Sequence, residues 1–174
     1  MAPEHKLYEI NSRPMIRNVK DDDLEALLAY NEAAVPHVNS IPIEELMWYK
    51  QHAVYFWVAE IESKVAGFLI VLAPGLQYDS ENYIWFSEAY PSFAYVDRIV
   101  IAEFARGKGL GKALYQKLFE EAGSFTERVT CEVNTFPPNP ESLSFHKVMG
   151  FKEVGQQETE GGTKTVSLQA KELN

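Results

Sequence analysis

A strand, a glycine-rich turn and a helix follow one another between residues 94 and 115, and this succession constrains the fold more than any other part of the chain. The turn, Arg106-Gly-Lys-Gly-Leu-Gly111, lets the backbone approach a ligand closely. Leu114 and Leu118 then recur at helical spacing. The unpaired N–H groups at the start of such a helix favour a phosphate or pyrophosphate. The strand before the turn is rich in β-branched residues, which suit a buried sheet position: Val96, Ile99, Val100 and Ile101.

The glycine turn matches neither of the common nucleotide-binding motifs. A Walker A loop begins with Gly and ends in Gly-Lys-Ser/Thr, but alignment on Gly111 and Lys112 puts Arg106 first and Ala113 last. The dinucleotide fingerprint Gly-x-Gly-x-x-Gly also fails, because its last position is not a glycine in either alignment. What remains is Arg-x-x-Gly-x-Gly, formed by Arg106, Gly109 and Gly111. An ordinary glycine turn is the alternative interpretation.

A second pattern covers residues 139–151, Asn-Pro-Glu-Ser-Leu-Ser-Phe-His-Lys-Val-Met-Gly-Phe. Asn139 can cap a helix with Pro140 at its first position, and Gly150 can end that helix. A predicted hairpin, residues 54–61 and 65–72, precedes both patterns. In this order the three features resemble the GNAT superfamily of N-acetyltransferases, in which the first pattern is the pyrophosphate loop for acetyl-CoA. The resemblance covers roughly residues 15–170.

The resemblance implies an α/β (α+β) protein with a single GNAT domain, whose mixed central sheet is splayed in the middle and has helices on both faces. We expect an N-terminal lead-in over residues 1–13 and the N-acetyltransferase domain over 14–174. Residues 73–92 have two equal interpretations, a lid or binding loop and a short helix over 80–88. The other expected elements are strands at 15–19, 128–134, 151–155 and 164–170, and helices after 21–23, at 44–49 and at 141–149.

The net charge of −9 and the lack of a Lys/Arg block argue against a nucleic-acid partner. No run reaches the roughly 20 apolar residues of a membrane span, so we expect a cytoplasmic protein without a membrane partner. Cys131 is the single cysteine, which excludes an internal disulfide and a multi-Cys zinc site. It lies in an apolar strand pattern and is predicted to be a buried structural thiol. No metal is expected.

The resemblance implies acetyl-CoA as the cosubstrate and transfers roles to the matching positions. The pantetheine arm would lie along the strand, where an N–H near Val100 or Ile101 would polarise the thioester carbonyl. The pyrophosphate would lie on the turn and the start of the helix. The residues expected to bind the cosubstrate are Ile99, Val100, Ile101, Arg106, Gly107, Lys108, Gly109, Leu110, Gly111, Lys112, Asn134, Asn139 and His146.

The acceptor site is predicted from two segments. In the GNAT pattern the connection between the first two helices lines this site, which makes His37, Asn39 and Trp48 candidates. In residues 73–92, Tyr78 and Trp85 are the candidates, and the mixture of aromatic and acidic side chains there suits a cationic amine. A capped loop with packed aromatic side chains is the structural alternative.

The expected catalytic residues are His146 and Asp97. His146 lies four residues before Gly150, where many members of the superfamily carry a Tyr that protonates the leaving CoA thiolate, and imidazole titrates in the useful range. Packing without a catalytic role is the alternative. Asp97 is the expected general base, because simple alternation puts it on one face with Ile99 and Ile101 and turns Arg98 to the other. Glu132 is the second choice.

These residues predict direct transfer of an acetyl group from acetyl-CoA to a primary amine in a ternary complex. The acceptor is not identified by the sequence; a small-molecule amine is favoured and a peptide acceptor stays open. The alternative is a non-catalytic acyl-CoA-binding or sensing module on the same fold. A homodimer through the C-terminal strands is compatible with the sequence.

Overall fold

The computed structural model describes residues 13–174, which form a seven-stranded sheet in the order β1-β2-β3-β4-β5-β7-β6. The predicted lead-in thus lies almost entirely outside the described residues. All neighbouring strands are antiparallel except β4 and β5, which are parallel. The strands are β1 (Met15–Asn18), β2 (Tyr55–Ile61), β3 (Lys64–Leu72), β4 (Ala94–Ile101), β5 (Arg128–Phe136), β6 (Lys152–Thr159) and β7 (Lys164–Glu172). The predicted mixed α/β fold is confirmed.

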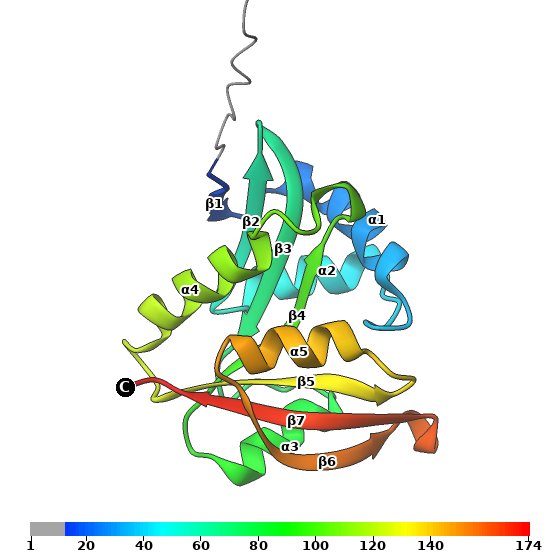
Figure 1. Ribbon diagram of the computed structural model, residues 1–174, viewed down its shortest axis with the longest axis vertical. Coiled ribbons are helices and arrows are strands. Elements are labelled where there is room, and N and C mark those ends of the chain that lie inside the picture. Colours follow the sequence, from blue (N-terminus) through cyan, green and yellow to red (C-terminus); the bar gives the residue numbers. More distant parts are fainter. Residues whose placement is uncertain (1–12) are drawn as a thin grey trace, which may run out of the picture.

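The sheet separates between β4 and β5. These strands pair only through Ala94 with Val129 and Tyr95 with Thr130, after which they diverge. Figure 1 shows the consequence, with β1 to β4 in one half of the molecule and β5, β7 and β6 in the other. The splayed sheet predicted from the family resemblance is therefore present, and it opens the centre of the molecule to a ligand.

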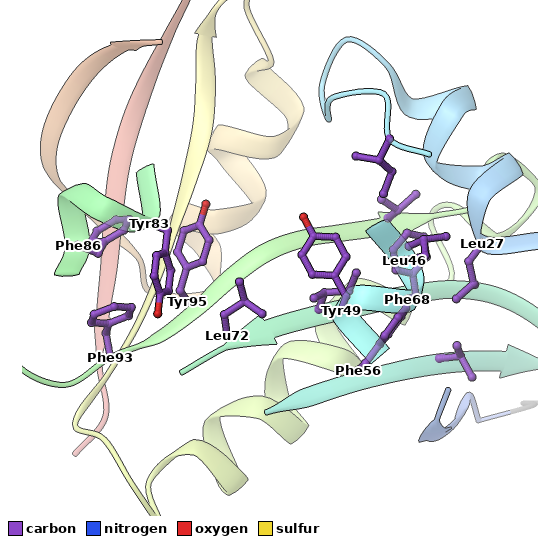
Figure 2. Close-up of a cluster of buried hydrophobic side chains, with 14 of the residues drawn as sticks. Leu27, Leu46, Tyr49, Phe56, Phe68, Leu72, Tyr83, Phe86, Phe93 and Tyr95 are labelled. Carbon is purple, nitrogen blue, oxygen red and sulfur yellow. The ribbon is translucent and has the colours of Figure 1, made fainter. Parts of the chain in front are cut away.

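Helices cover both faces of the sheet. On one face lie α1 (Leu24–Ala34), α2 (Ile43–His52) and α3 (Glu81–Ala89), whose buried side chains share a single cluster with the sheet. On the other face lie α4 (Leu110–Ala122) and α5 (Pro140–Val148), which pack into a second cluster. Figure 2 shows the first cluster reaching from Leu27 and Leu46 through Tyr49 and Leu72 to Tyr95. The cluster also includes Val166 and Leu168 of β7, so it spans both halves of the sheet.

Residues 73–92 contain a helix, as one of the two interpretations predicted. Ser80 caps α3 by accepting a hydrogen bond from the Tyr83 amide, and Tyr83 and Phe86 are buried against the sheet. The apolar face of this helix stabilises it against the sheet. Residues 73–80 form a connection outside helix and strand, with a turn at 74–75.

Most other boundaries agree with prediction to within two residues. The exceptions are the ends of α2, which continues to His52, and of β6, which continues to Thr159. Pro42 stands at the N-cap of α2, and β5 continues to Phe136. Asn139 caps α5 through Ser142 N, with Pro140 at the first position, and Gly150 follows the helix with φ +96°. Within residues 13–174, no helix combines the length and the apolar character needed to cross a membrane.

Candidate active site

A cleft of about 1270 Å³ lies where the two halves of the sheet separate. The backbone edge of β4 beyond Tyr95 faces this cleft, because β5 no longer pairs with it. The cleft has two walls of different chemistry. The phosphate wall is the turn 105–109 with the start of α4; the acceptor wall comprises Asn39, Trp48, Tyr78 and the β4 residues Asp97 and Arg98. All predicted cosubstrate-binding residues line the cleft except Lys108.

The phosphate wall presents backbone N–H groups. Gly107 and Gly109 have φ of +75° and +81°, a region that glycine adopts without strain, and Gly109 is the N-cap of α4. The first bond of the helix runs from Ala113 N to Gly109 O at 3.0 Å, so the N–H groups at the start of α4 have no acceptor within the helix. These groups and the positive end of the helix dipole suit a pyrophosphate.

The third glycine of the turn serves packing. A Cβ atom at Gly111 would lie 3.1 Å from Cζ of Phe145, which is closer than ordinary van der Waals contact. Gly111 therefore lets α5 approach the first turn of α4. The sequence motif thus combines two requirements, backbone conformation at Gly107 and Gly109 and helix contact at Gly111.

A bulge in β4 reverses the predicted orientation of Arg98. Arg98 pairs with Ile70, but the next pair joins Val96 to Val71, so Asp97 is an extra residue between them. Asp97 Oδ2 consequently accepts a hydrogen bond from Arg98 Nε at 2.8 Å, and both side chains are 4% exposed. The expectation that Arg98 faces away from Asp97 is wrong, since simple alternation does not hold across a bulge.

The same bulge separates Asp97 from the isoleucines with which it was predicted to share a face. Ile99 and Ile101 pack with the cluster of α4 and α5, whereas Arg98 lies over the ring of Tyr49 on the α2 side. Asp97 also accepts a hydrogen bond from Tyr78 Oη. The carboxylate is therefore part of the acceptor wall and is held by two donors.

Every N–H group of the Arg98 guanidinium has an acceptor. Besides Asp97, it donates to Asn31 Oδ1 at 2.8 Å, to Asn39 Oδ1 at 2.9 Å, to Asn39 O at 3.4 Å and to Tyr49 Oη at 3.3 Å. A guanidinium has five such groups. Tyr49 and Tyr78 complete the network with a 2.6 Å hydrogen bond between their hydroxyls. Arg98 thus joins α1, the α1–α2 connection, α2 and β4.

Glu132 is the cleft carboxyl with the most altered acidity. Burial raises its pKa to about 8; the nearby charge of Asp97 adds to the shift, and hydrogen bonds from Tyr95 and Asn82 oppose it. The Tyr95 hydroxyl lies 2.9 Å and 2.8 Å from the two carboxyl oxygens. Glu132 is half-buried and lines the cleft on β5. In contrast to Asp97, it has no cationic partner among residues 13–174.

His146 is buried between α5 and α4. Its Nδ1 lies 2.7 Å from Ser142 O, which can only accept, so Nδ1 carries the proton of the neutral ring. Nε2 then accepts from the Tyr115 hydroxyl at 2.7 Å. Burial lowers the pKa of His146, with the Ser142 contact acting in the other direction. The neutral ring therefore offers no further N–H to the cleft.

A family model described as the acetyltransferase (GNAT) family matches residues 6–151. The chain belongs to this family. None of the curated proteins compared with the chain matches it.

Solved structures assigned as acetyltransferases share the fold of this chain. A protein assigned as a phosphinothricin N-acetyltransferase is 25% identical, with a TM-score of 0.70 over 93% of this chain and 99% of that one. The Salmonella typhimurium protein yncA, whose structure contains acetyl-CoA, is 16% identical, with a TM-score of 0.69 over 94% and 95%. Arabidopsis thaliana NAA60, in complex with a bisubstrate analogue, is 18% identical, with a TM-score of 0.75 over 93% and 99%.

Four of the five predicted acceptor residues of this GNAT chain line the cleft, and one does not. His37, Asn39, Trp48 and Tyr78 line the cleft, although the Asn39 side chain is held by Arg98. Trp85 does not line it: its indole lies against β6, where a Cβ atom at Gly155 would be 2.7 Å from Trp85 Cζ2.

Sequence reasoning missed Tyr49 and Tyr115. Each is an aromatic residue at a helical core spacing, and nothing in that pattern distinguishes a hydroxyl that enters a polar network from one that does not.

Cys131 is buried, and burial raises the pKa of its thiol, in keeping with the predicted structural role. No group of three or more side chains suited to a metal ion occurs among residues 13–174.

Proposed function

We propose that this protein is an acetyl-CoA-dependent N-acetyltransferase that acts on a primary amine in a ternary complex. The observation that carries the proposal is that one cleft joins the open N-terminus of α4 to an uncompensated carboxyl, Glu132. The first group suits the anionic end of acetyl-CoA. The second suits an amine that must lose a proton before it attacks.

The residues of the phosphate wall fit acetyl-CoA, which when bound supplies an activated acetyl group. Gly107, Gly109 and the first turn of α4 would hold the pyrophosphate through backbone N–H groups. The free edge of β4 at Ile99–Ile101 would accept the pantetheine arm, and an N–H near Val100 would polarise the thioester carbonyl. Asn134 and Asn139 line the same part of the cleft.

We place the proton-accepting role at Glu132, the second choice from sequence, rather than at Asp97. Asp97 is held by Arg98 and Tyr78, so accepting a proton would break an ion pair that is almost fully buried. Glu132 forms no ion pair within residues 13–174, and although the charge of Arg98 opposes the shift, its raised pKa is matched to proton transfer near neutral pH. Asp97 acts on it through its charge, which keeps that pKa high.

His146 as the proton donor to the thiolate stays a prediction. In the neutral form its Nε2 lone pair is occupied by Tyr115, so donation requires prior protonation of the ring. Burial opposes that protonation. The contacts therefore favour a role in holding Tyr115 and α4 in place. If His146→Phe lowers turnover without lowering thermal stability, the donor role gains support.

The first test is isothermal titration with acetyl-CoA, with CoA, ATP and NAD as comparison ligands. We expect binding of acetyl-CoA in the micromolar range and its loss in Gly109→Glu, which places a negative charge and a strained residue at the anion site. Gly123→Glu is the matched control, because Gly123 lies at the far end of α4, with ordinary φ and open space around it. Absence of acetyl-CoA binding by the unmodified protein would refute the proposal.

A non-catalytic acyl-CoA-binding module is the alternative function. It predicts acetyl-CoA binding without release of a thiol in the presence of any amine. A screen of amines with a thiol-release assay separates the two, and turnover that depends on Glu132 would exclude the alternative.

A further inference from the structure

The acceptor wall contains a guanidinium that cannot bind an acceptor carboxylate. Arg98 lines the cleft, but its five N–H groups are already bonded to Asp97, Asn31, Asn39 and Tyr49. A new anion would have to displace one of these acceptors from a side chain that is 4% exposed. Breaking a buried pair of this kind is strongly unfavourable.

The remaining cations of the cleft lie elsewhere or are paired. Arg106 and Lys112 belong to the phosphate wall. Lys164 stands at the start of β7, where its Nζ lies 3.4 Å from a Glu160 carboxyl oxygen. Among the residues that the structure describes, the acceptor wall thus offers no unpaired lysine or arginine to a carboxylate-bearing acceptor.

Several cleft carboxyls form no ion pair within residues 13–174, and among them Glu132 on β5 and Glu45 on α2 are those whose pKa is raised by burial. Burial raises the pKa of Glu45, with Arg98 opposing and Asp97 adding to the shift. A ligand cation beside either carboxyl would offset the unfavourable burial of its ionised form, because an opposite charge favours that form.

An aromatic surface adjoins Glu45. Trp48 follows it by three residues on α2 and stacks on two rings, on Tyr78 with centroids 5.5 Å apart at 15° and on His52 with centroids 4.3 Å apart at 14°. Trp48 and Tyr78 line the cleft. The parts of the two rings that line the cleft offer apolar contact to methylene groups, and an ammonium group beside them would be attracted to their π-electrons. Neighbouring carboxylates and aromatic side chains therefore suit an aliphatic chain with a charged nitrogen.

We propose that the acceptor is an aliphatic diamine or longer polyamine without a carboxylate, whose reacting nitrogen lies at Glu132 and whose second, ammonium nitrogen lies at Glu45 beside Trp48. This inference rests on the proposed function and specifies its substrate class. An α-amino acid is excluded by the saturated Arg98, since its carboxylate would lie unpaired among acidic side chains.

The test uses three acceptors with four carbon atoms that differ at the carbon farthest from the reacting nitrogen: 1,4-diaminobutane, butylamine and 4-aminobutanoate. An ion pair in a partly buried site supports a preference of about 10-fold or more in kcat/KM for the diamine over butylamine, with 4-aminobutanoate lowest. Equal rates for the diamine and butylamine would overturn the inference, as would a preference for 4-aminobutanoate or for a peptide N-terminus.

Glu45→Gln locates the second nitrogen. We expect about a 10-fold loss in kcat/KM for the diamine and little change for butylamine. Glu25→Gln is the matched control, because it changes the net charge equally at an exposed position of α1 outside the cleft. An equal loss for both amines in Glu45→Gln would overturn the assignment. Absence of turnover with every amine, despite acetyl-CoA binding, would instead refute the proposed function, and with it this inference.

Discussion

The two walls of the cleft bind by different means. The phosphate wall uses backbone N–H groups from one continuous segment, residues 105–112, and depends on glycine conformation at Gly107 and Gly109. The acceptor wall uses side chains from separate segments, held together by Arg98 and Asp97. The first wall therefore depends on a local sequence pattern, whereas the second depends on contacts between segments that are distant in sequence.

This difference predicts where mutations act. A change in the phosphate wall affects the local backbone and the cosubstrate. A change at the centre of the acceptor wall affects several segments together, because each is joined to the same guanidinium. Four predictions test this contrast.

Glu132→Gln is expected to have the largest effect. Removal of the proton acceptor should lower turnover by about 100- to 10,000-fold, with unchanged acetyl-CoA affinity by titration. Glu127→Gln, an exposed position just before β5, is the control and should retain full turnover. Full turnover in Glu132→Gln would contradict this assignment and favour Asp97, the base expected from the sequence. The pH profile gives a second measurement: because the carboxylate form is the active base, kcat/KM should rise with pH and level off above about 8, following the pKa of Glu132.

Asp97→Asn should disrupt the acceptor wall as a unit. It leaves the buried Arg98 charge without its carboxylate, which costs about 3–5 kcal/mol in unfolding free energy, measurable by urea denaturation. In material that stays folded, the pH midpoint should move down, because the charge of Asp97 raises the pKa of Glu132. Asp79→Asn, exposed on the connection before α3, should change stability little. If Asp97→Asn is as stable as the parent, the ion pair does not hold the wall together.

Tyr115→Phe should have an intermediate effect. It leaves Nε2 of the buried His146 without a hydrogen bond, at a cost of about 1–3 kcal/mol. Thermal denaturation measures the change, and Tyr90→Phe is the control, because the described residues supply no hydrogen bond to that hydroxyl. A loss of turnover much larger than the loss of stability would instead favour a catalytic role for Tyr115 and His146.

The smallest effects are expected at the glycines of the phosphate wall. Gly109→Ala forces a left-handed conformation on a residue with a Cβ and should cost about 1–2 kcal/mol. Gly111→Ala should cost less, because a gain in helix propensity of about 1 kcal/mol offsets displacement of the Phe145 ring. Denaturation of both variants measures the order, and the reverse order would show that helix contact limits this wall more than backbone conformation does.

The elements of the fold could largely be predicted, because their signals are local. The capping of α5 by Asn139 and its end at Gly150 are properties of neighbouring residues, and so is the left-handed turn at Gly109. The family resemblance supplied the splay of the sheet between β4 and β5. The segment 73–92 was ambiguous because the aromatic pattern of α3 is short and its burial depends on the sheet beneath it.

The acceptor wall could not be predicted. Alternation assigns Asp97 and Arg98 to opposite faces, and only the register with β3 brings them together, because Asp97 is an extra residue of β4 opposite the Ile70–Val71 step. The acceptors of Arg98 come from Asn31, Asn39 and Tyr49, which are distant in sequence and meet only when α1 and α2 pack on the sheet. Trp85, by contrast, packs against Gly155 of β6 and lies outside the cleft.

By itself the sequence determined the phosphate wall, because glycine conformation and helix capping act within a few residues and leave a recognisable spacing. The tertiary structure decided which carboxyl is held and which is free. Asp97 pairs with Arg98 because of a bulge in β4, whereas Glu132 on the diverging β5 is desolvated and forms no ion pair with any residue that the structure describes. Charge pairing and desolvation depend on distances between segments, and those distances exist only once the sheet has folded and separated.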